Sequence, residues 1–273
     1  MYTFISKVGR KVCVMFKRNM STAVLCYLVM MCGLVLAGCG KKPGTQMFTY
    51  VKKDDATIEI TGFTDAAKEQ SSFIIPTEID GIKESFRDCA NIKEISIAEG
   101  VETIGENAFL GCYNLETINF PSTIESVGTN VVKNTIWEKN EYEQYGAVII
   151  NNILSSVQNV PSEYKLPDGI KKIASGVFYG NTQLTKIDMG SSLEEIGTYA
   201  FAGCTGITEL SIPSSVKNIG YGAFSQCTNL TVSVPDTVGQ VGQEAFYKVK
   251  FVEYKGKLGG AYWGAAAGGT EKQ

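Results

Sequence analysis

The stretch that decides the fold runs from residue 178 to residue 235, FYGNTQLTKIDMGSSLEEIGTYAFAGCTGITELSIPSSVKNIGYGAFSQCTNLTVSVP, and it states one pattern twice. Phe201 and Phe224 are 23 residues apart, and so are Cys204 and Cys227. A fixed step of this length is the signature of a solenoid, in which one supersecondary unit stacks on copies of itself. The sequence therefore predicts a repeat fold.

The same step extends to both sides of this stretch. The large residue of each unit recurs at Phe86, Phe109, Val132, Phe178, Phe201, Phe224 and Phe246. The interval between Val132 and Phe178 is 46 residues, which is two steps of 23. We therefore expect one unit to be rewritten there without loss of register.

Each unit contains two short apolar segments. In the first, Leu184-x-x-Ile187-x-Met189, alternate residues are apolar, which indicates a short strand with one face inside. The second ends in Ile196-Gly197, and its glycine allows a tight bend. The A-F-x-x-C that follows is expected to form one helical turn, and a proline such as Pro213 marks the corner between the two segments.

The whole pattern, L-x-x-I-x-I-P-x-x-V-x-x-I-G-x-x-A-F-x-x-C, resembles the BspA-like leucine-rich repeats of bacterial cell-surface proteins and covers roughly residues 73–249. The resemblance implies a mainly β, right-handed solenoid with parallel strands along one face and single helical turns. It implies no catalytic activity.

The first 38 residues differ in character from the repeats. They contain five basic residues, no acid, and an apolar run from Ala23 to Ala37. This run of about 15 residues is short for a membrane span, which needs about 20, and suits the core of a signal peptide. It ends in Leu36-Ala37-Gly38-Cys39, which resembles the lipobox of bacterial lipoproteins.

The lipobox resemblance implies cleavage between Gly38 and Cys39 and a diacylglyceryl group on Cys39. Two acyl chains give stable anchoring, so we expect an extracytoplasmic protein that is lipid-anchored to the bacterial cell membrane. The alternative is an uncleaved transmembrane anchor with an unmodified cysteine.

Loss of residues 1–38 leaves a net charge of about −8. An acidic surface argues against nucleic acid as a partner and against electrostatic docking on anionic lipid. The expected membrane contact is therefore the lipid itself, and the expected state is a monomer.

The segments are expected to divide the chain as follows. We assign 1–38 to the signal peptide, 39–46 to a lipidated tether, 47–85 to an N-terminal cap with a hairpin at 48–63 and an irregular first repeat, 86–249 to the repeat array with a rewritten hairpin unit at 133–166, and 250–273 to a C-terminal cap and tail.

Four cysteines, Cys89, Cys112, Cys204 and Cys227, occupy one position of the repeat, three residues after a phenylalanine. This spacing does not match a metal site. We favour a buried ladder of thiols over disulfides within Cys89/Cys112 and Cys204/Cys227. Side chains stacked in register lie about 4.8 Å apart, above the usual Cβ separation of a disulfide.

No feature of the sequence predicts catalysis. It contains no histidine, no phosphate-binding glycine loop and no nucleophile elbow. We therefore expect neither a catalytic residue, nor a metal, nor a cofactor.

Two sets of residues are candidates for binding. The first is the outward set on the strands, which is small and polar: Glu94, Ser96, Thr117, Asn119, Lys186, Asp188, Glu209 and Ser211. The second is the aromatic set of the rewritten unit, Trp137, Tyr142 and Tyr145, because aromatic residues anchor interfaces. The alternative for Trp137 is that it fills the core where repeat residues are missing.

These observations predict a non-catalytic, lipid-anchored surface protein that binds an extracellular protein or glycan. Two other functions stay open. One is a structural spacer of the envelope without a tight ligand, and the other is carbohydrate recognition through the aromatic set.

Overall fold

The computed structural model describes residues 48–52, 58–63, 71–75, 86–254, 256 and 262–269. They belong to one compact unit, Met47–Gln273. The predicted signal peptide, the lipobox and the tether lie outside the described residues, as do most of the irregular first repeat and the end of the C-terminal tail.

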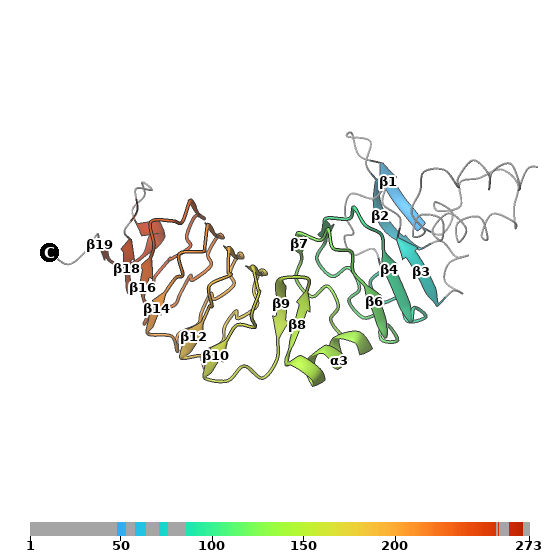
Figure 1. Ribbon diagram of the computed structural model, residues 1–273, viewed down its shortest axis with the longest axis horizontal. Coiled ribbons are helices and arrows are strands. Elements are labelled where there is room, and N and C mark those ends of the chain that lie inside the picture. Colours follow the sequence, from blue (N-terminus) through green and yellow to red (C-terminus); the bar gives the residue numbers. More distant parts are fainter. Residues whose placement is uncertain are drawn as a thin grey trace, which may run out of the picture. The chain divides into compact units, whose positions relative to one another are not determined.

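The unit is a mainly β solenoid of parallel strands, as the repeat predicts (Figure 1). The first apolar segment of each repeat forms one row of strands. They are β3 (Ser72–Ile75), β4 (Glu94–Ile97), β6 (Thr117–Asn119), β10 (Glu163–Lys165), β12 (Lys186–Asp188), β14 (Glu209–Ser211), β16 (Thr231–Val234), β18 (Phe251–Tyr254) and β19 (Gly268–Gly269). They pair in the orders β3-β4-β6, β10-β12 and β14-β16-β18-β19.

The second apolar segment forms the other row of strands. They are β5 (Thr103–Ile104), β7 (Ser126–Val127), β9 (Ile153–Val157), β11 (Lys172–Ile173), β13 (Glu195–Ile196), β15 (Asn218–Ile219) and β17 (Gln240–Val241), with β8 (Ala147–Ile150) beside β9. The orders are β5-β7 and β17-β15-β13-β11-β9-β8. Apart from β8 with β9, the pairs in this row are parallel.

The register follows the repeat. Ile196 pairs with Ile173 on one side and with Ile219 on the other. In the first row, Ile187 and Leu210 are buried while the residues that flank them on β12 and β14 are exposed. Each apolar residue therefore packs on its own equivalent in the next repeat, which is why the period of 23 persists.

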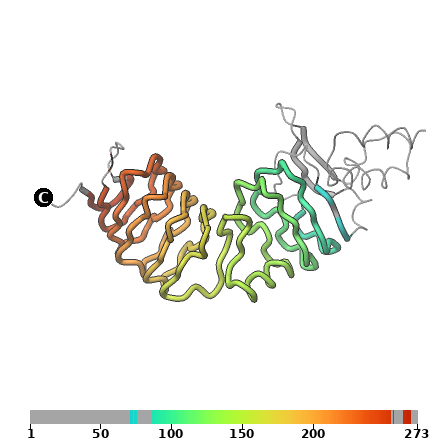
Figure 2. The backbone as a smooth tube through the Cα atoms, in the orientation of Figure 1, coloured from blue at the N-terminus to red at the C-terminus, as the bar shows by residue number. Residues whose placement is uncertain are grey.

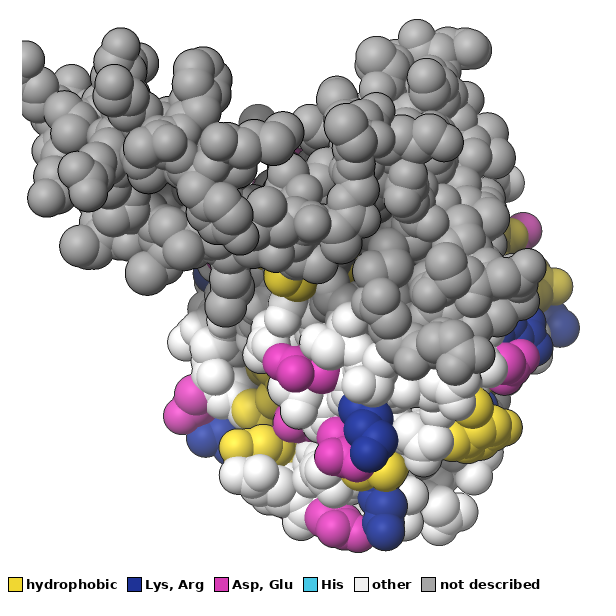
Figure 3. Space-filling view, turned by 90° about the vertical axis from the view of Figure 1, so that its right-hand side faces the viewer, with side chains coloured by type: hydrophobic (Ala, Val, Ile, Leu, Met, Phe, Trp, Pro, Cys, Tyr) yellow, Lys and Arg dark blue, Asp and Glu magenta, His cyan; other side chains and the backbone are white. Residues whose placement is uncertain are grey.

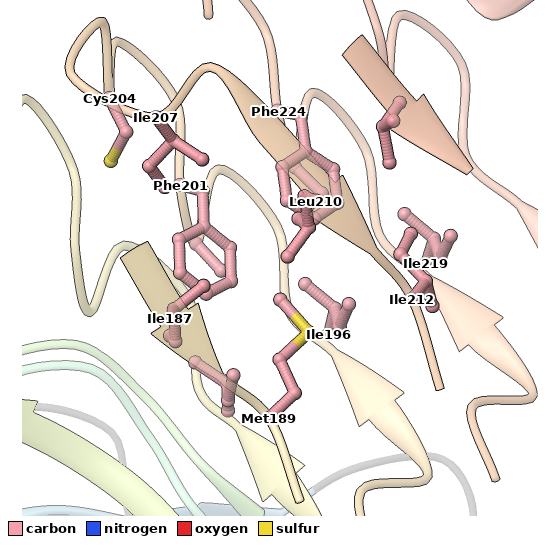
Figure 4. Close-up of a cluster of buried hydrophobic side chains, with 14 of the residues drawn as sticks. Ile187, Met189, Ile196, Phe201, Cys204, Ile207, Leu210, Ile212, Ile219 and Phe224 are labelled. Atoms are coloured by element: carbon pink, nitrogen blue, oxygen red, sulfur yellow. The ribbon is translucent and has the colours of Figure 1, made fainter. Parts of the chain in front are cut away.

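The core is a stack of phenylalanine rings surrounded by aliphatic side chains (Figure 4). The rings of Phe178 and Phe201 lie 4.9 Å apart, and those of Phe201 and Phe224 lie 5.2 Å apart with an interplanar angle of 1°. Phe246 continues this stack, and Phe86 stacks on Phe109 at 5.3 Å. The buried residues form two clusters that meet at the rewritten unit, since β8 and β9 contribute residues to both.

The A-F-x-x-C segment forms hydrogen-bonded turns in which the amide of Cys204 donates to the carbonyl of Phe201 at 3.1 Å. Each turn also pairs with the next repeat, since the amide of Phe201 donates to the carbonyl of Ala223 at 2.8 Å. Two residues of the turn, Tyr199 and Gly203, have positive φ, which lets the chain reverse within a few residues.

The rewritten unit contains the predicted hairpin, in which β8 and β9 are antiparallel around Asn151 and Asn152 (Figure 2). It also contains an α-helix that the pattern did not predict, α3 (Ile136–Tyr145). The hydroxyl of Thr135 accepts from the amide of Glu138 at 2.9 Å, and Gly146 ends the helix with a φ of 69°. Threonine followed three residues later by glutamate is the signal that could have found it.

Short elements lie at both ends of the unit where it is described. Strands β1 (Phe48–Lys52) and β2 (Ile58–Phe63) form the antiparallel hairpin. At the other end, the short 3-10 helix η2 (Tyr262–Gly264) carries Trp263. Its ring packs against those of Phe246 and Tyr254, and its carbonyl accepts from the amide of Phe246 at 3.2 Å. Trp263 therefore closes the phenylalanine stack.

Candidate interaction surface

The predicted outward residues of β12 and β14 lie on one exposed face. Lys186, Asp188, Glu209 and Ser211 are all exposed and alternate with buried neighbours. This alternation follows from the strand geometry, in which successive side chains point to opposite faces.

The other four predicted residues lie on β4 and β6. Glu94 is in register with Thr117, and Ser96 with Asn119. The amide nitrogen Nδ2 of Asn119 donates to Oγ of Ser96 at 3.0 Å. The structure thus distributes the eight residues over three sheets: β4 and β6 share one, whereas β12 and β14 belong to two others.

The face on β12 and β14 extends further than the sequence indicated. Glu163 and Lys165 on β10 stand in register with Lys186 and Asp188, and Thr231 on β16 stands in register with Glu209. Sequence reasoning missed β10 because the rewritten unit lacks the apolar pattern of the other strands. We name this surface, formed by the outward residues of β10, β12, β14 and β16, the strand face.

The strand face carries both signs of charge, and one ion pair joins two of its residues. Nζ of Lys186 lies 3.8 Å from Oε2 of Glu163, and Oδ1 of Asp188 accepts from the amide of Gly190 at 2.9 Å. The strand face therefore offers hydrogen-bonding groups more than a net charge.

The second row of strands carries paired charges too. Lys172 and Glu195, in register on β11 and β13, are joined at 2.8 Å, and Lys171 and Glu194 are joined at 3.0 Å. On the end of the molecule shown in Figure 3, acidic and basic side chains are interspersed over the described part of the surface.

The three aromatic residues predicted as a second site do not form one platform. Trp137 packs against the ring of Phe120 at 5.5 Å and against the N-terminal core cluster. The hydroxyl of Tyr142 donates to Ser156 at 2.8 Å, whereas Tyr145 is 60% exposed. This placement supports the interpretation in which Trp137 fills the core.

A groove beside α3 brings Tyr142 together with a different aromatic residue. It has a volume of about 700 Å³ and is lined by Tyr113, Thr135, Lys139 and Tyr142, among others. Tyr113 is 59% exposed. Burial raises the pKa of the Tyr142 phenol above its ordinary value. Tyr113 follows Cys112 at a variable position of the repeat, so no sequence signal singled it out.

The buried cysteines form the expected ladder of thiols. The thiols of Cys112, Cys204 and Cys227 each donate to the phenylalanine carbonyl of the preceding repeat, at 2.8, 3.0 and 3.0 Å. Burial raises the pKa of Cys204 to about 11 and that of Cys227 to about 12. For Cys112 a hydrogen bond with Cys89 and burial raise the pKa still further.

The same position holds other polar residues where cysteine is missing. Oδ1 of Asn181 accepts from the amides of Gln183 and Leu184, and Oγ1 of Thr135 donates to the carbonyl of Val132 at 2.7 Å. The side chain at this repeat position therefore forms hydrogen bonds with backbone groups at the corner of the repeat. The thiols have this structural role. In the part of the chain that the structure describes, no group of histidine, cysteine and acidic residues could hold a metal ion.

Within the described ranges, no helix has the length and apolar character needed to cross a membrane.

Comparison with known proteins gives one family. The model of the BspA type leucine-rich repeat region matches residues 52–138 and 149–255, in six copies. No curated protein matches the chain.

Several solved structures are similar. A leucine-rich repeat protein of T. pallidum is 19% identical, with 78% of this chain and 86% of that chain covered and a TM-score of 0.31. A leucine-rich cell surface protein of Faecalibacterium prausnitzii is 16% identical, with coverage of 80% and 95% and a TM-score of 0.35. A leucine-rich repeat protein of Eubacterium ventriosum is 17% identical, with coverage of 77% and 77% and a TM-score of 0.36.

Proposed function

Since the chain belongs to the BspA type leucine-rich repeat family, we propose that it is a non-catalytic, lipid-anchored protein of the bacterial cell surface that binds an extracellular protein or glycan. The observation that carries this proposal is the strand face. Its outward residues stand in register within the pairs β10/β12 and β14/β16, so polar side chains of varied type follow one another at about 4.8 Å.

A surface of this kind suits an extended macromolecule better than a small ligand. Neighbouring repeats can each contribute a few hydrogen bonds, and the total grows with the number of repeats engaged. Because Lys186 and Glu163 are already paired, the contacts add little net charge. We therefore expect binding to depend only weakly on salt, unlike the binding of a nucleic acid.

The anchor completes the proposal. Cys39 follows Leu36-Ala37-Gly38 directly after the apolar run, and two acyl chains on its sulfur would hold the protein stably on the membrane. The repeat unit would then face the medium outside the cell, where its partner is found.

The test of the proposed function compares two matched variants of the full chain in detergent micelles on an array of extracellular matrix proteins, mucins and glycans. In the face variant, Lys186, Asp188, Glu209 and Ser211 become alanine. In the control variant, the outward residues of the other row, Lys172, Glu195, Asn218 and Gln240, become alanine.

We expect at least one ligand on the array to bind the unmodified chain and the control variant but not the face variant. An array without any ligand would contradict the binding role and favour a structural spacer. If the face variant and the control variant bind the ligand equally well, the binding site lies elsewhere than the strand face.

The groove beside α3 favours carbohydrate recognition as a second candidate function, since Tyr113 and Tyr142 line it with polar neighbours. Trp137 lies on the same helix and serves as a reporter. Glycans that bind in the groove should change its fluorescence, and the Tyr113→Ala variant should abolish that change. Fluorescence that no glycan alters would count against this candidate.

A further inference from the structure

The corner turns of the solenoid are joined by a regular ladder of backbone hydrogen bonds. The amides of Gly176 and Phe178 donate to the carbonyls of Thr198 and Ala200, at 3.0 and 2.8 Å. In the N-terminal repeats, the amide of Phe109 donates to the carbonyl of Val131 at 2.7 Å. Each turn thus accepts from the turn before it and donates to the turn after it.

The rewritten unit interrupts this ladder. Strand β9 continues to Val157 and pairs there with β8, so the unit forms no turn at the corner. As a result, the amides of Asn130 and Val132 have no acceptor among the described residues, and the carbonyls of Ser175 and Val177 have no donor among them. The amide of Asn134, the next in the series, donates to the carboxylate of Glu138 at 2.8 Å.

A cavity of about 410 Å³ lies where the turn is missing. The turn at 129–133 forms one wall, the turn at 175–177 forms the other, and Ser155, Ser156 and Val157 also line it. Stacked strands are about 4.8 Å apart, so two walls that have lost one layer between them stand about 10 Å apart, which is room for one backbone.

We propose that this cavity is a binding slot for an extended peptide segment of a partner protein, which completes the interrupted ladder. A peptide group in the slot would direct its carbonyl toward the amides of Asn130 and Val132. It would direct its N–H toward the carbonyls of Ser175 and Val177. This proposal names a peptide as the partner in the proposed binding function. It rests on that function only because it assumes that the protein has a partner.

The two walls are chemically complementary to a peptide. One wall offers donors two residues apart and the other offers acceptors two residues apart, which is the pattern that a single extended chain satisfies on its two sides. A glycan hydroxyl could meet either wall, but it has no rigid unit with a donor and an acceptor on opposite sides. We therefore expect the slot to bind a peptide backbone and not a glycan.

The side chain that points into the slot must be small. The ring of Tyr164 already packs on Phe178 at 5.4 Å, where the missing repeat would have placed its own ring. Val157 and Val177 are partly buried against the core and line the slot. We therefore expect Ala, Ser or Val at the inward position of the peptide and exclude aromatic residues there.

The test follows the amide of Val132 by nuclear magnetic resonance in the full chain, labelled with ¹⁵N-valine, in detergent micelles. The probe is the peptide acetyl-Ser-Ala-Val-Ala-Ser-amide. We expect a saturable downfield shift and slower hydrogen exchange at Val132, and no change at Val216, whose amide already donates to Pro213.

Two N-methylated forms of the peptide provide the matched control on an unaltered protein. Successive amides of an extended chain point to opposite sides, so methylation of one alternate set should abolish the shift while methylation of the other set leaves it. Equal losses with both sets, or no loss with either, would overturn the proposal. So would an amide of Val132 that exchanges slowly before any peptide is added, because a segment of this chain would then fill the slot.

A pair of variants locates the peptide. Ser155→Trp fills the cavity and should abolish the shift at Val132, whereas Ser214→Trp, at an exposed position outside the cavity, should leave it. A shift that survives Ser155→Trp contradicts the slot. These results are independent of the array experiment, because loss of the strand face leaves the slot intact.

Discussion

At the scale of single residues, a glycine and a tyrosine in adjacent repeats show how closely the turns pack. Gly222 has a φ of 57°, and a Cβ at this position would overlap the ring of Tyr199. That ring also meets Tyr221 edge-on at 5.2 Å. The glycine therefore has two effects: it avoids the strain of a side chain at positive φ, and it leaves room for the ring.

We predict that Gly222→Ala lowers the free energy of unfolding by more than Gly190→Ala does. Gly190 has a similar φ of 64° but no atom within 4 Å of the added Cβ, so its loss of about 1–2 kcal/mol reports backbone strain alone. Urea unfolding measures both variants. In a Tyr199→Ala background the difference should vanish, and a difference that persists would refute the role of the ring.

The phenylalanine of each repeat is expected to contribute most to stability. Phe201 is fully buried between the rings of Phe178 and Phe224. Phe201→Ala should lower the free energy of unfolding by about 3–5 kcal/mol because it leaves a cavity. Ser211→Ala, on the exposed strand face, should change it by less than about 0.5 kcal/mol. Equal melting temperatures for the two variants would show that the inside and outside positions are wrongly assigned.

The buried thiols predict a loss of stability at alkaline pH. The pKa of Cys204 is raised from 9.0 to about 11 and that of Cys227 to about 12, so the folded state disfavours the thiolate that the unfolded state forms from about pH 9. Their contribution is complete below pH 9 and declines as the pH rises toward 11 to 12. Urea unfolding between pH 8 and 11 measures this decline.

The control is the double variant Cys204→Ser/Cys227→Ser, which keeps hydrogen-bond donors but does not titrate in this range. Its stability should fall less steeply with pH than that of the unmodified chain. Parallel curves for the two proteins would contradict the assignment of the alkaline loss to these thiols.

The sequence alone was sufficient to predict the positions of the residues that recur in each repeat. The positions of Phe201, Phe224 and the cysteines recur at a fixed step, and each recurrence strengthens the assignment. Tyr113 and the glycine–tyrosine contact occur once, so no recurrence indicated them. That the outward residues bind a partner stays a prediction. Exposed polar residues show the same sequence pattern on a surface that binds a partner and on one that does not.

At the scale of the elements, α3 depends on the residue that caps its N-terminus. The hydroxyl of Thr135 accepts from the amide of Glu138 and donates to the carbonyl of Val132. Thr135→Ala should therefore lower the free energy of unfolding by about 1 kcal/mol or more, the usual range for an N-cap. Thr185→Ala, which removes a bond to the carbonyl of Ser162 on the exposed surface, is the control and should cost less.

Circular dichroism and urea unfolding of both threonine variants check this prediction. Equal losses for Thr135→Ala and Thr185→Ala would mean that the helix does not depend on its cap.

The strands were predictable and the helix was not, for a physical reason. A strand such as β14 repeats the apolar pattern of its neighbours because their side chains share one core. The α3 segment has no counterpart in the other described repeats, and none of its residues is fully buried. Its only signals were the threonine–glutamate pair at its start and the glycine after its end.

At the scale of the whole molecule, the two core clusters should respond separately to destabilisation. The N-terminal cluster contains Phe86 and Phe109, and the C-terminal cluster contains the stack from Phe178 to Phe246. Because repeats contact mainly their neighbours, a defect should remain local. Phe109→Ala should speed hydrogen exchange in residues 86–132 and leave residues 184–249 nearly unchanged.

Hydrogen exchange read by mass spectrometry measures both segments in one experiment. Phe201→Ala is the reciprocal variant and should give the opposite result. Uniform acceleration over the whole repeat unit in either variant would show one cooperative core instead of two.

The proposal that the repeat unit is displayed outside the cell on a lipid anchor depends on Cys39. The most direct measurement is the intact mass of the protein extracted with detergent from the membranes of its own cells. We expect the mass of residues 39–273 plus a diacylglyceryl group, with or without a third acyl chain. A mass that retains residues 1–38 and carries no lipid would contradict the anchor and the surface display that follows from it.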